Sequence, residues 1–151
     1  MRRKAAPMNN ILAVLLLLPS LALSQPTIPS PENFFGFKIG DDRKLIDWTQ
    51  IVSYFKTVDE QSGRVVVQEL GKTTLGKPFL LAIISSEATI QNLERAKSIQ
   101  RQLAKPYALE AEPAAKLIAG GKTVVLITLN IHSTEIASTQ ESVELLYDFA
   151  T

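Results

Sequence analysis

The sequence predicts an α/β domain with a mixed sheet. Two apolar runs, residues 64–70 and 79–85, are joined by a short connection rich in glycine and proline, which indicates an antiparallel pair of strands. A third apolar run, residues 122–129, comes after a helical segment and reads as a third buried strand. The expected order is helix, strand, strand, helix, strand, helix.

The helices are predicted from apolar spacing and from their start and stop signals. The first begins at Asp41-Asp42, where a capping acid lies at the positive end of the helix dipole, and ends before Ser62-Gly63. Its apolar face contains Leu45, Trp48, Ile51, Val52, Phe55 and Val58. The others cover residues 89–104, a short stretch at 112–119 and a final helix from about residue 134 to residue 151.

The first 24 residues are predicted to be a signal peptide. Three basic residues at 2–4 precede an apolar core at 11–18, and Ala22-Leu23-Ser24 offers small residues for cleavage before Gln25. An eight-residue core is much shorter than the ~20 residues that span a bilayer, so an uncleaved anchor is the less favoured alternative. We therefore expect export to the periplasm or the medium, with no stable membrane association after cleavage.

Composition indicates one globular domain, which we place at residues 41–151 behind a lead-in at 25–40 that is rich in proline and phenylalanine. Apolar residues make up 46% of the chain and charged residues 21%. Without the three basic residues at 2–4, 13 of the 16 basic residues remain, against 15 acidic ones. The sequence shows no cluster of basic residues that would suggest nucleic-acid binding. The chain has no cysteine, so packing alone must stabilise the fold. The composition does not define the oligomeric state.

The candidate functional stretch is residues 130–135, Asn-Ile-His-Ser-Thr-Glu, between the third predicted strand and the last helix. His132 is the only histidine in the chain. A histidine at the end of a strand and a carboxylate three residues later can aim their side chains at one point, as two zinc ligands do. Alone the pattern is weak, because His132 also fits a polar loop and Glu135 also fits a first helical turn.

The chain resembles the zinc carboxypeptidases of the carboxypeptidase A type. Residues 71–80 look like the hairpin of that family, in which a turn with two glycines leads into an apolar strand. Residues 47–54 look like the preceding helix, which ends near a tyrosine, and residues 123–137 look like the strand that delivers the H-x-x-E pair. The resemblance covers residues 33–151.

This resemblance implies an exported zinc metallocarboxypeptidase that hydrolyses C-terminal residues of peptides or proteins with a zinc-activated water. His132 and Glu135 would bind Zn²⁺. The fold implied is a three-layer α/β peptidase fold, truncated after its first three strands. The second histidine, the substrate-binding arginines and the catalytic glutamate are expected downstream of Thr151, so residues 41–151 would be the N-terminal part of the catalytic domain. Asn130 departs from the small residue that the family often has there.

Other functions remain open at this point. The same zinc architecture serves related amidases, deacylases and hydrolases of cell-wall peptides. A catalytically inactive binding domain, in which His132 and Glu135 are ordinary residues, is the alternative from a different class. If the leading interpretation is correct, we expect this chain alone to bind metal weakly and to have no peptidase activity. The uncapped, apolar last helix also predicts that the chain is a fragment.

Overall fold

The order of elements confirms an α/β arrangement over the residues that the structure, a computed structural model, describes, namely 27–151. The elements are α1 (Pro31–Phe35), α2 (Trp48–Gln61), β1 (Val65–Lys72), β2 (Pro78–Ile84), α3 (Glu87–Gln91), α4 (Leu93–Leu103), the 3₁₀ helix η1 (Pro106–Ala108), α5 (Ala111–Gly120) and α6 (Ile136–Ala150). The predicted signal peptide lies outside the described residues. Within residues 27–151, no helix is long and apolar enough to cross a bilayer.

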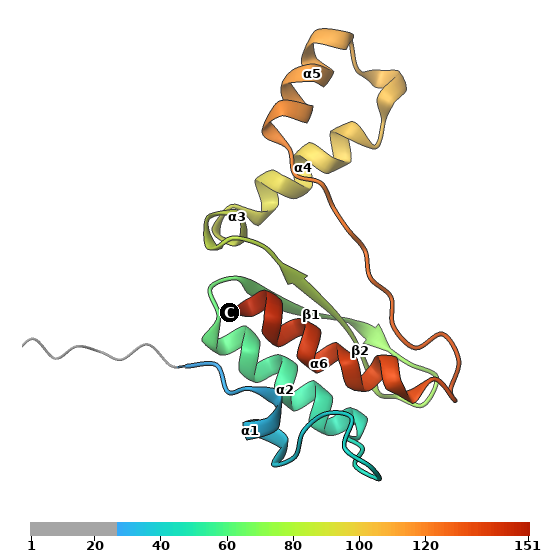
Figure 1. Cartoon of the computed structure of the whole chain (residues 1–151). Helices are drawn as coiled ribbons and strands as arrows, with labels where there is room; N and C mark the ends of the chain where they lie inside the picture. The colour runs from blue at the N-terminus through green and yellow to red at the C-terminus, as the bar shows by residue number, and fades with distance from the viewer. Residues whose placement is uncertain (1–26) are drawn as a thin grey trace, which may run out of the picture.

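A two-stranded antiparallel hairpin, β1–β2, carries the two longest helices (Figure 1). Both α2 and α6 contact the hairpin and each other, so they cover one face of it (Figure 1). The core consists of eight buried residues: Ile46, Ile51, Tyr54, Val58, Val65, Val143, Leu146 and Ala150. Because α2 contributes three of them at spacings of three and four residues, its predicted apolar face is confirmed in part.

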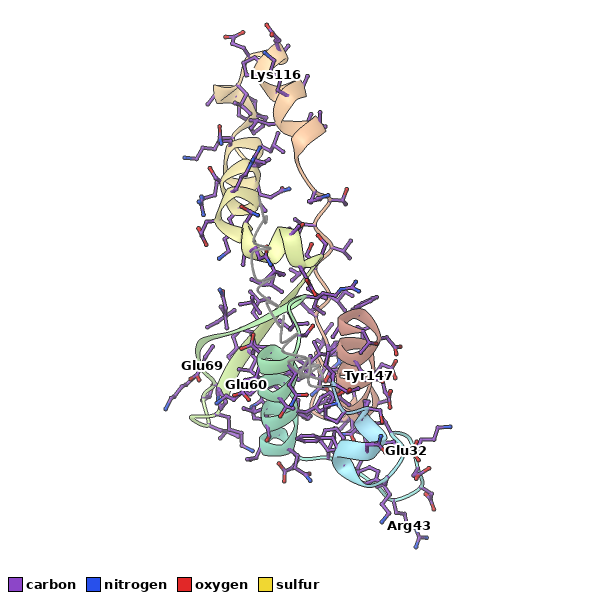
Figure 2. The ribbon with its side chains drawn as sticks, turned by 90° about the vertical axis from the view of Figure 1, so that its left-hand side faces the viewer. Glu32, Arg43, Glu60, Glu69, Lys116 and Tyr147 are labelled. Carbon is purple, nitrogen blue, oxygen red and sulfur yellow. The ribbon has the colours of Figure 1, made fainter. Side chains whose placement is uncertain are left out.

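The third layer implied by the resemblance does not form among the described residues. Instead, α3, α4 and α5 extend away from the hairpin as a helical arm (Figure 1). Figure 2 shows Lys116 of α5 at the far end of this arm, well away from Tyr147 on α6. The observed fold is therefore a small mixed α/β body with a projecting arm.

The third predicted strand, residues 122–129, is wrong for this structure. The segment is not part of the sheet, and it runs from α5 to the loop before α6 (Figure 1). Four consecutive apolar side chains in it, from Val124 to Ile127, are 51–76% exposed. A strand requires a neighbour for its backbone groups, and an apolar pattern alone supplies none. The sequence pattern reported a preference for burial, not a partner.

The first long helix starts later than predicted, at Trp48 instead of at Asp41-Asp42. Arg43 adopts a left-handed conformation, with φ of 58°, which interrupts any helix through that position. Asp47 is the true N-cap: its carboxylate accepts from the Gln50 backbone N–H at 3.0 Å, and the Gln50 side chain accepts from the Asp47 N–H at 2.9 Å. This reciprocal pair is a capping box.

Asp47→Ala is expected to lower the free energy of unfolding by about 1 kcal/mol, because the first turn of α2 loses its side-chain acceptor. Thermal or urea denaturation measures the change. Asp42→Ala is the matched control, since the Asp42 side chain is exposed and contacts only the exposed Arg43. A loss of equal size in the two variants would contradict the assignment of Asp47 as the cap.

The loop before α2 is tied to α6, and the first residue of α2 is tied to the hairpin. Gln140 of α6 pairs with the backbone of Ile46 in both directions, accepting from its N–H at 2.9 Å and donating to its carbonyl at 3.1 Å. The indole N–H of Trp48 donates to the carbonyl of Pro78 at 3.1 Å. These bonds hold the N-terminal end of α2 against α6 and the hairpin.

The aromatic lead-in packs on the body. Phe34 and Phe35 lie with their ring centroids 5.0 and 5.3 Å from that of Tyr54. The Tyr54 hydroxyl donates to the carbonyl of Pro29 at 2.9 Å. Burial raises the pKa of the Tyr54 phenol above its ordinary value. The lead-in therefore closes one side of the core instead of trailing from it.

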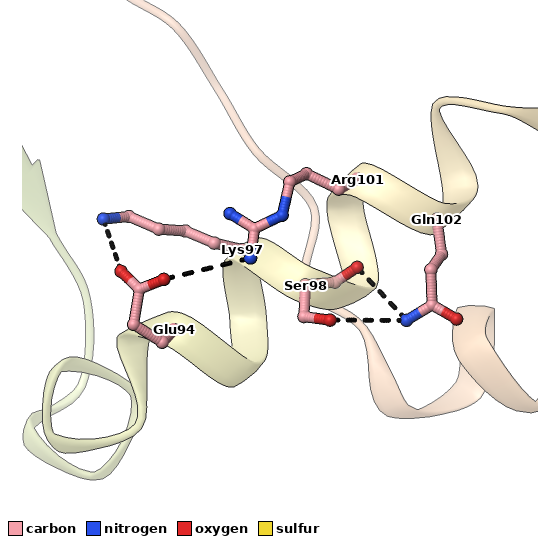
Figure 3. Close-up of polar contacts among 5 residues, drawn as sticks. All are labelled: Glu94, Lys97, Ser98, Arg101 and Gln102. Carbon is pink, nitrogen blue, oxygen red and sulfur yellow. Dashed lines mark hydrogen bonds and ion pairs between the residues drawn. The ribbon is translucent and has the colours of Figure 1, made fainter.

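The helix predicted over residues 89–104 is divided into α3 and α4 at Asn92. Asn92 has φ of −116°, and its amide donates to the carbonyl of Ala88 at 2.9 Å, so its side chain competes with the helical ladder. On α4, Glu94 contacts Lys97 at 2.9 Å and Arg101 at 3.9 Å (Figure 3). The hydrogen bond from Lys97 lowers the pKa of Glu94, but an exposed pair of this kind adds little stability.

Candidate metal centre

The stretch that carries the predicted ligands forms a turn at the start of α6. The backbone N–H of Glu135 donates to the carbonyl of His132 at 3.0 Å, and Glu135 is the N-cap of the helix. Helix α6 begins at Ile136, two residues after its predicted start. The pair is thus presented by a turn between an extended segment and a helix, and not by the end of a paired strand.

The turn brings His132 and Glu135 together. The imidazole Nδ1 lies 2.7 Å from Oε1 of the carboxylate. The other carboxylate oxygen, Oε2, accepts from the backbone N–H of His132 at 3.1 Å. Both oxygens of Glu135 therefore point back to the same residue, and the side chain is held at two points.

The contacts with His132 favour the ionised form of Glu135. The hydrogen bond with the imidazole, and then that with the His132 backbone, hold the pKa of the Glu135 carboxyl below its usual range. The two side chains are 70% and 50% exposed, so water screens their interaction. The pair is a surface feature whose atoms remain accessible to a ligand.

The donor types and their placement fit one edge of a zinc site. Zinc binds one imidazole nitrogen and one carboxylate oxygen at about 2.0–2.2 Å each, which in a tetrahedral site places the two atoms about 3.3 Å apart. Nδ1 and Oε1 are at 2.7 Å, so a small opening of the pair would accommodate the ion in place of the shared proton. Across residues 27–151, no group of three or more His, Cys, Asp or Glu side chains is placed to hold a metal ion.

The same contacts also close the turn before α6 without any metal. Glu135 accepts from the backbone N–H of His132, three residues earlier, although its side chain makes no cap bond to the helix itself. The geometry of the His132–Glu135 pair fits both a ligand role and a structural role.

A hollow of about 480 Å³ lies elsewhere, between α4 and α5, and is lined in part by Ile99 and Leu117. His132 and Glu135 do not line it.

Asn130, two residues before His132, was not predicted to have a role in the site, but its side chain bonds to the turn. Asn130 has φ of 65°, in the left-handed region. Asparagine is one of the few residues other than glycine that adopt this conformation readily. An asparagine two residues before the histidine is the signal that was available in the sequence.

No protein-family model, curated protein or solved structure matches this chain. The functional interpretation therefore depends on the motifs in the sequence and on the geometry of the pair.

Proposed function

We propose that residues 41–151 form the N-terminal part of the catalytic domain of an exported zinc metallocarboxypeptidase, with His132 and Glu135 as two of its zinc ligands. The observation that carries the proposal is the convergence of Nδ1 and Oε1 at 2.7 Å on an accessible surface. The hairpin, whose turn resembles that of the family, forms in the expected place and supports it. The remaining ligand and the general base would come from outside residues 27–151.

In this function the residues of the chain hold and orient the metal. Zinc held there would polarise the carbonyl of a peptide bond and lower the pKa of a water molecule, the two effects that hydrolysis needs. His132 would bind it through Nδ1, the ring atom that already faces Glu135. Its backbone N–H fixes Oε2 of Glu135 and leaves Oε1 as the oxygen available to the metal. Such an outer contact orients a ligand and reduces the entropy that binding must remove.

A catalytically inactive binding domain is the competing function, and one observation favours it. The contacts between His132 and Glu135 are complete without a metal, because both carboxylate oxygens already have partners. A zinc-dependent amidase, deacylase or cell-wall hydrolase would have the same ligand pair and would differ in the substrate pocket. The metal content of the protein separates the inactive binding domain, which would hold no zinc, from the zinc enzymes.

Zinc binding by the purified chain tests the proposal. We expect one weakly bound zinc per chain, and we expect His132→Ala to weaken binding at least tenfold, equivalent to about 1.4 kcal/mol. Isothermal titration with ZnCl₂ gives the affinity, and circular dichroism confirms that the variant is folded. Glu141→Gln is the matched control, because this carboxylate is also exposed on α6 but lies outside the turn. Equal affinity of His132→Ala and the unaltered chain would exclude His132 as a ligand.

A further inference from the structure

The side chain of Asn130 bridges the turn that carries the His132–Glu135 pair. With its amide nitrogen toward the turn, Asn130 donates to the carbonyl oxygens of His132 at 2.7 Å and Glu135 at 2.9 Å. Its amide oxygen then accepts from the Thr139 hydroxyl at 3.0 Å. This orientation places the nitrogen against acceptors and the oxygen against a donor, and it satisfies both ends of the amide.

These three bonds connect every part of the site. One goes to the backbone of the histidine, one to the backbone of the glutamate, and one to the first turn of α6 through Thr139. The left-handed backbone of Asn130, with φ of 65°, turns the chain so that the amide faces the loop that follows. This conformation is strained for most residues other than glycine, and the local hydrogen bonds of an asparagine amide offset that strain.

The ligand pair needs such a support, because its side chains have little packing of their own. They are 70% and 50% exposed, and their contacts with each other set their rotamers. Any change in the distance between the two backbones therefore changes the distance between Nδ1 and Oε1. Asn130 bonds to both backbones and so fixes that distance.

We propose that Asn130 is a positioning residue for the His132–Glu135 pair. Its amide holds the backbones of both residues, so that imidazole and carboxylate converge. Thr139 holds the amide oxygen from α6. The consequence for metal affinity rests on the proposed function, whereas the consequence for the geometry of the pair does not. The Asn130 amide bonds to the backbone carbonyls of His132 and Glu135 and not to Nδ1 or Oε1, so its effect acts through the two residues that it holds.

The test uses the only histidine of the chain, because its ring nitrogens give unambiguous ¹⁵N NMR signals. A carboxylate that accepts from Nδ1 favours the tautomer protonated at that nitrogen. Asn130→Gly removes the amide but keeps a residue that adopts positive φ without strain. We expect this variant to lose the preference for the Nδ1–H tautomer and to bind zinc about tenfold more weakly, the lower end for loss of an outer-shell partner.

Thr139→Val is the second variant, because it removes one contact of the amide without altering Asn130, and we expect a smaller shift in the same direction. Asn92→Ala is the control, since it deletes another asparagine amide at the junction of α3 and α4. An unchanged His132 tautomer in Asn130→Gly would overturn the positioning role, whatever the zinc affinity. A shifted tautomer with no zinc binding by the unaltered chain would support the positioning role and contradict the metal function.

Discussion

Replacing Tyr54 by alanine is expected to lower the free energy of unfolding by about 3–5 kcal/mol, the range for removal of a large aromatic side chain from a core. Tyr54 is fully buried, with 0% of its surface exposed. Its ring packs against Phe34 and Phe35, and its hydroxyl holds the carbonyl of Pro29. The truncation would leave a cavity at the point where α2 meets the lead-in. Since domains of ordinary stability have about 5–15 kcal/mol, much of the population would unfold on mild heating.

Urea denaturation followed by the fluorescence of Trp48, the only tryptophan, measures this loss. Tyr54→Phe separates the two contributions: it keeps the ring and removes the hydroxyl, and we expect it to cost about 1 kcal/mol. Tyr107→Ala is the matched control, because Tyr107 is fully exposed and should change stability by less than about 0.5 kcal/mol. An unfolding midpoint of Tyr54→Ala equal to that of the control would contradict the packing of the lead-in on α2.

The importance of Tyr54 was only partly predictable. The apolar spacing identified Ile51 and Val58 as members of a buried face, and both are buried. Leu45, assigned to the same face, is 59% exposed, because the chain before Asp47 is not helical. The sequence indicated Tyr54 only through the resemblance of residues 47–54 to a family helix that ends near a tyrosine. Its burial depends on Phe34 and Phe35, which lie some twenty residues away and outside any local pattern.

The hairpin and the third predicted strand show where sequence patterns are sufficient. Residues 65–72 and 78–84 pair with each other across a short turn, so each supplies the hydrogen-bond partner that the other needs. Residues 122–129 have an equally apolar pattern, but among residues 27–151 no strand pairs with them. Periodicity reports which side chains favour burial. It does not identify the chain that buries them.

The geometry of the candidate site was also predictable only in part. The three-residue offset between His132 and Glu135 was enough to predict that their side chains could aim at one point, and they lie 2.7 Å apart. The supporting role of Asn130 was missed, because asparagine is common in loops and its three contacts follow from a left-handed backbone that the sequence does not specify. The metal itself stays a prediction.

The exposed apolar segment at residues 122–129 is expected to drive self-association of the purified chain. It forms no helix and does not pair with the sheet, and its side chains include Val125 at 76% and Ile127 at 51% exposure. An exposed, unpaired apolar strand is a template for pairing with another chain. We expect the double variant Val125→Lys and Ile127→Lys to raise the concentration at which the protein associates by at least tenfold. Burial of each such side chain contributes about 1.5–3 kcal/mol to association, and 1.4 kcal/mol is a factor of ten.

The stability of the domain should be almost unchanged in this variant, because both side chains are already exposed and lie outside the eight-residue core. Sedimentation velocity over a concentration series measures association, and thermal denaturation measures stability. Leu75→Lys with Tyr107→Lys is the matched control: it adds the same two charges at exposed apolar positions in the hairpin turn and in η1. If the control suppresses association equally, net charge and not the segment is responsible. Suppression by the first pair alone assigns the association to residues 122–129, where the apolar pattern has no strand to pair with.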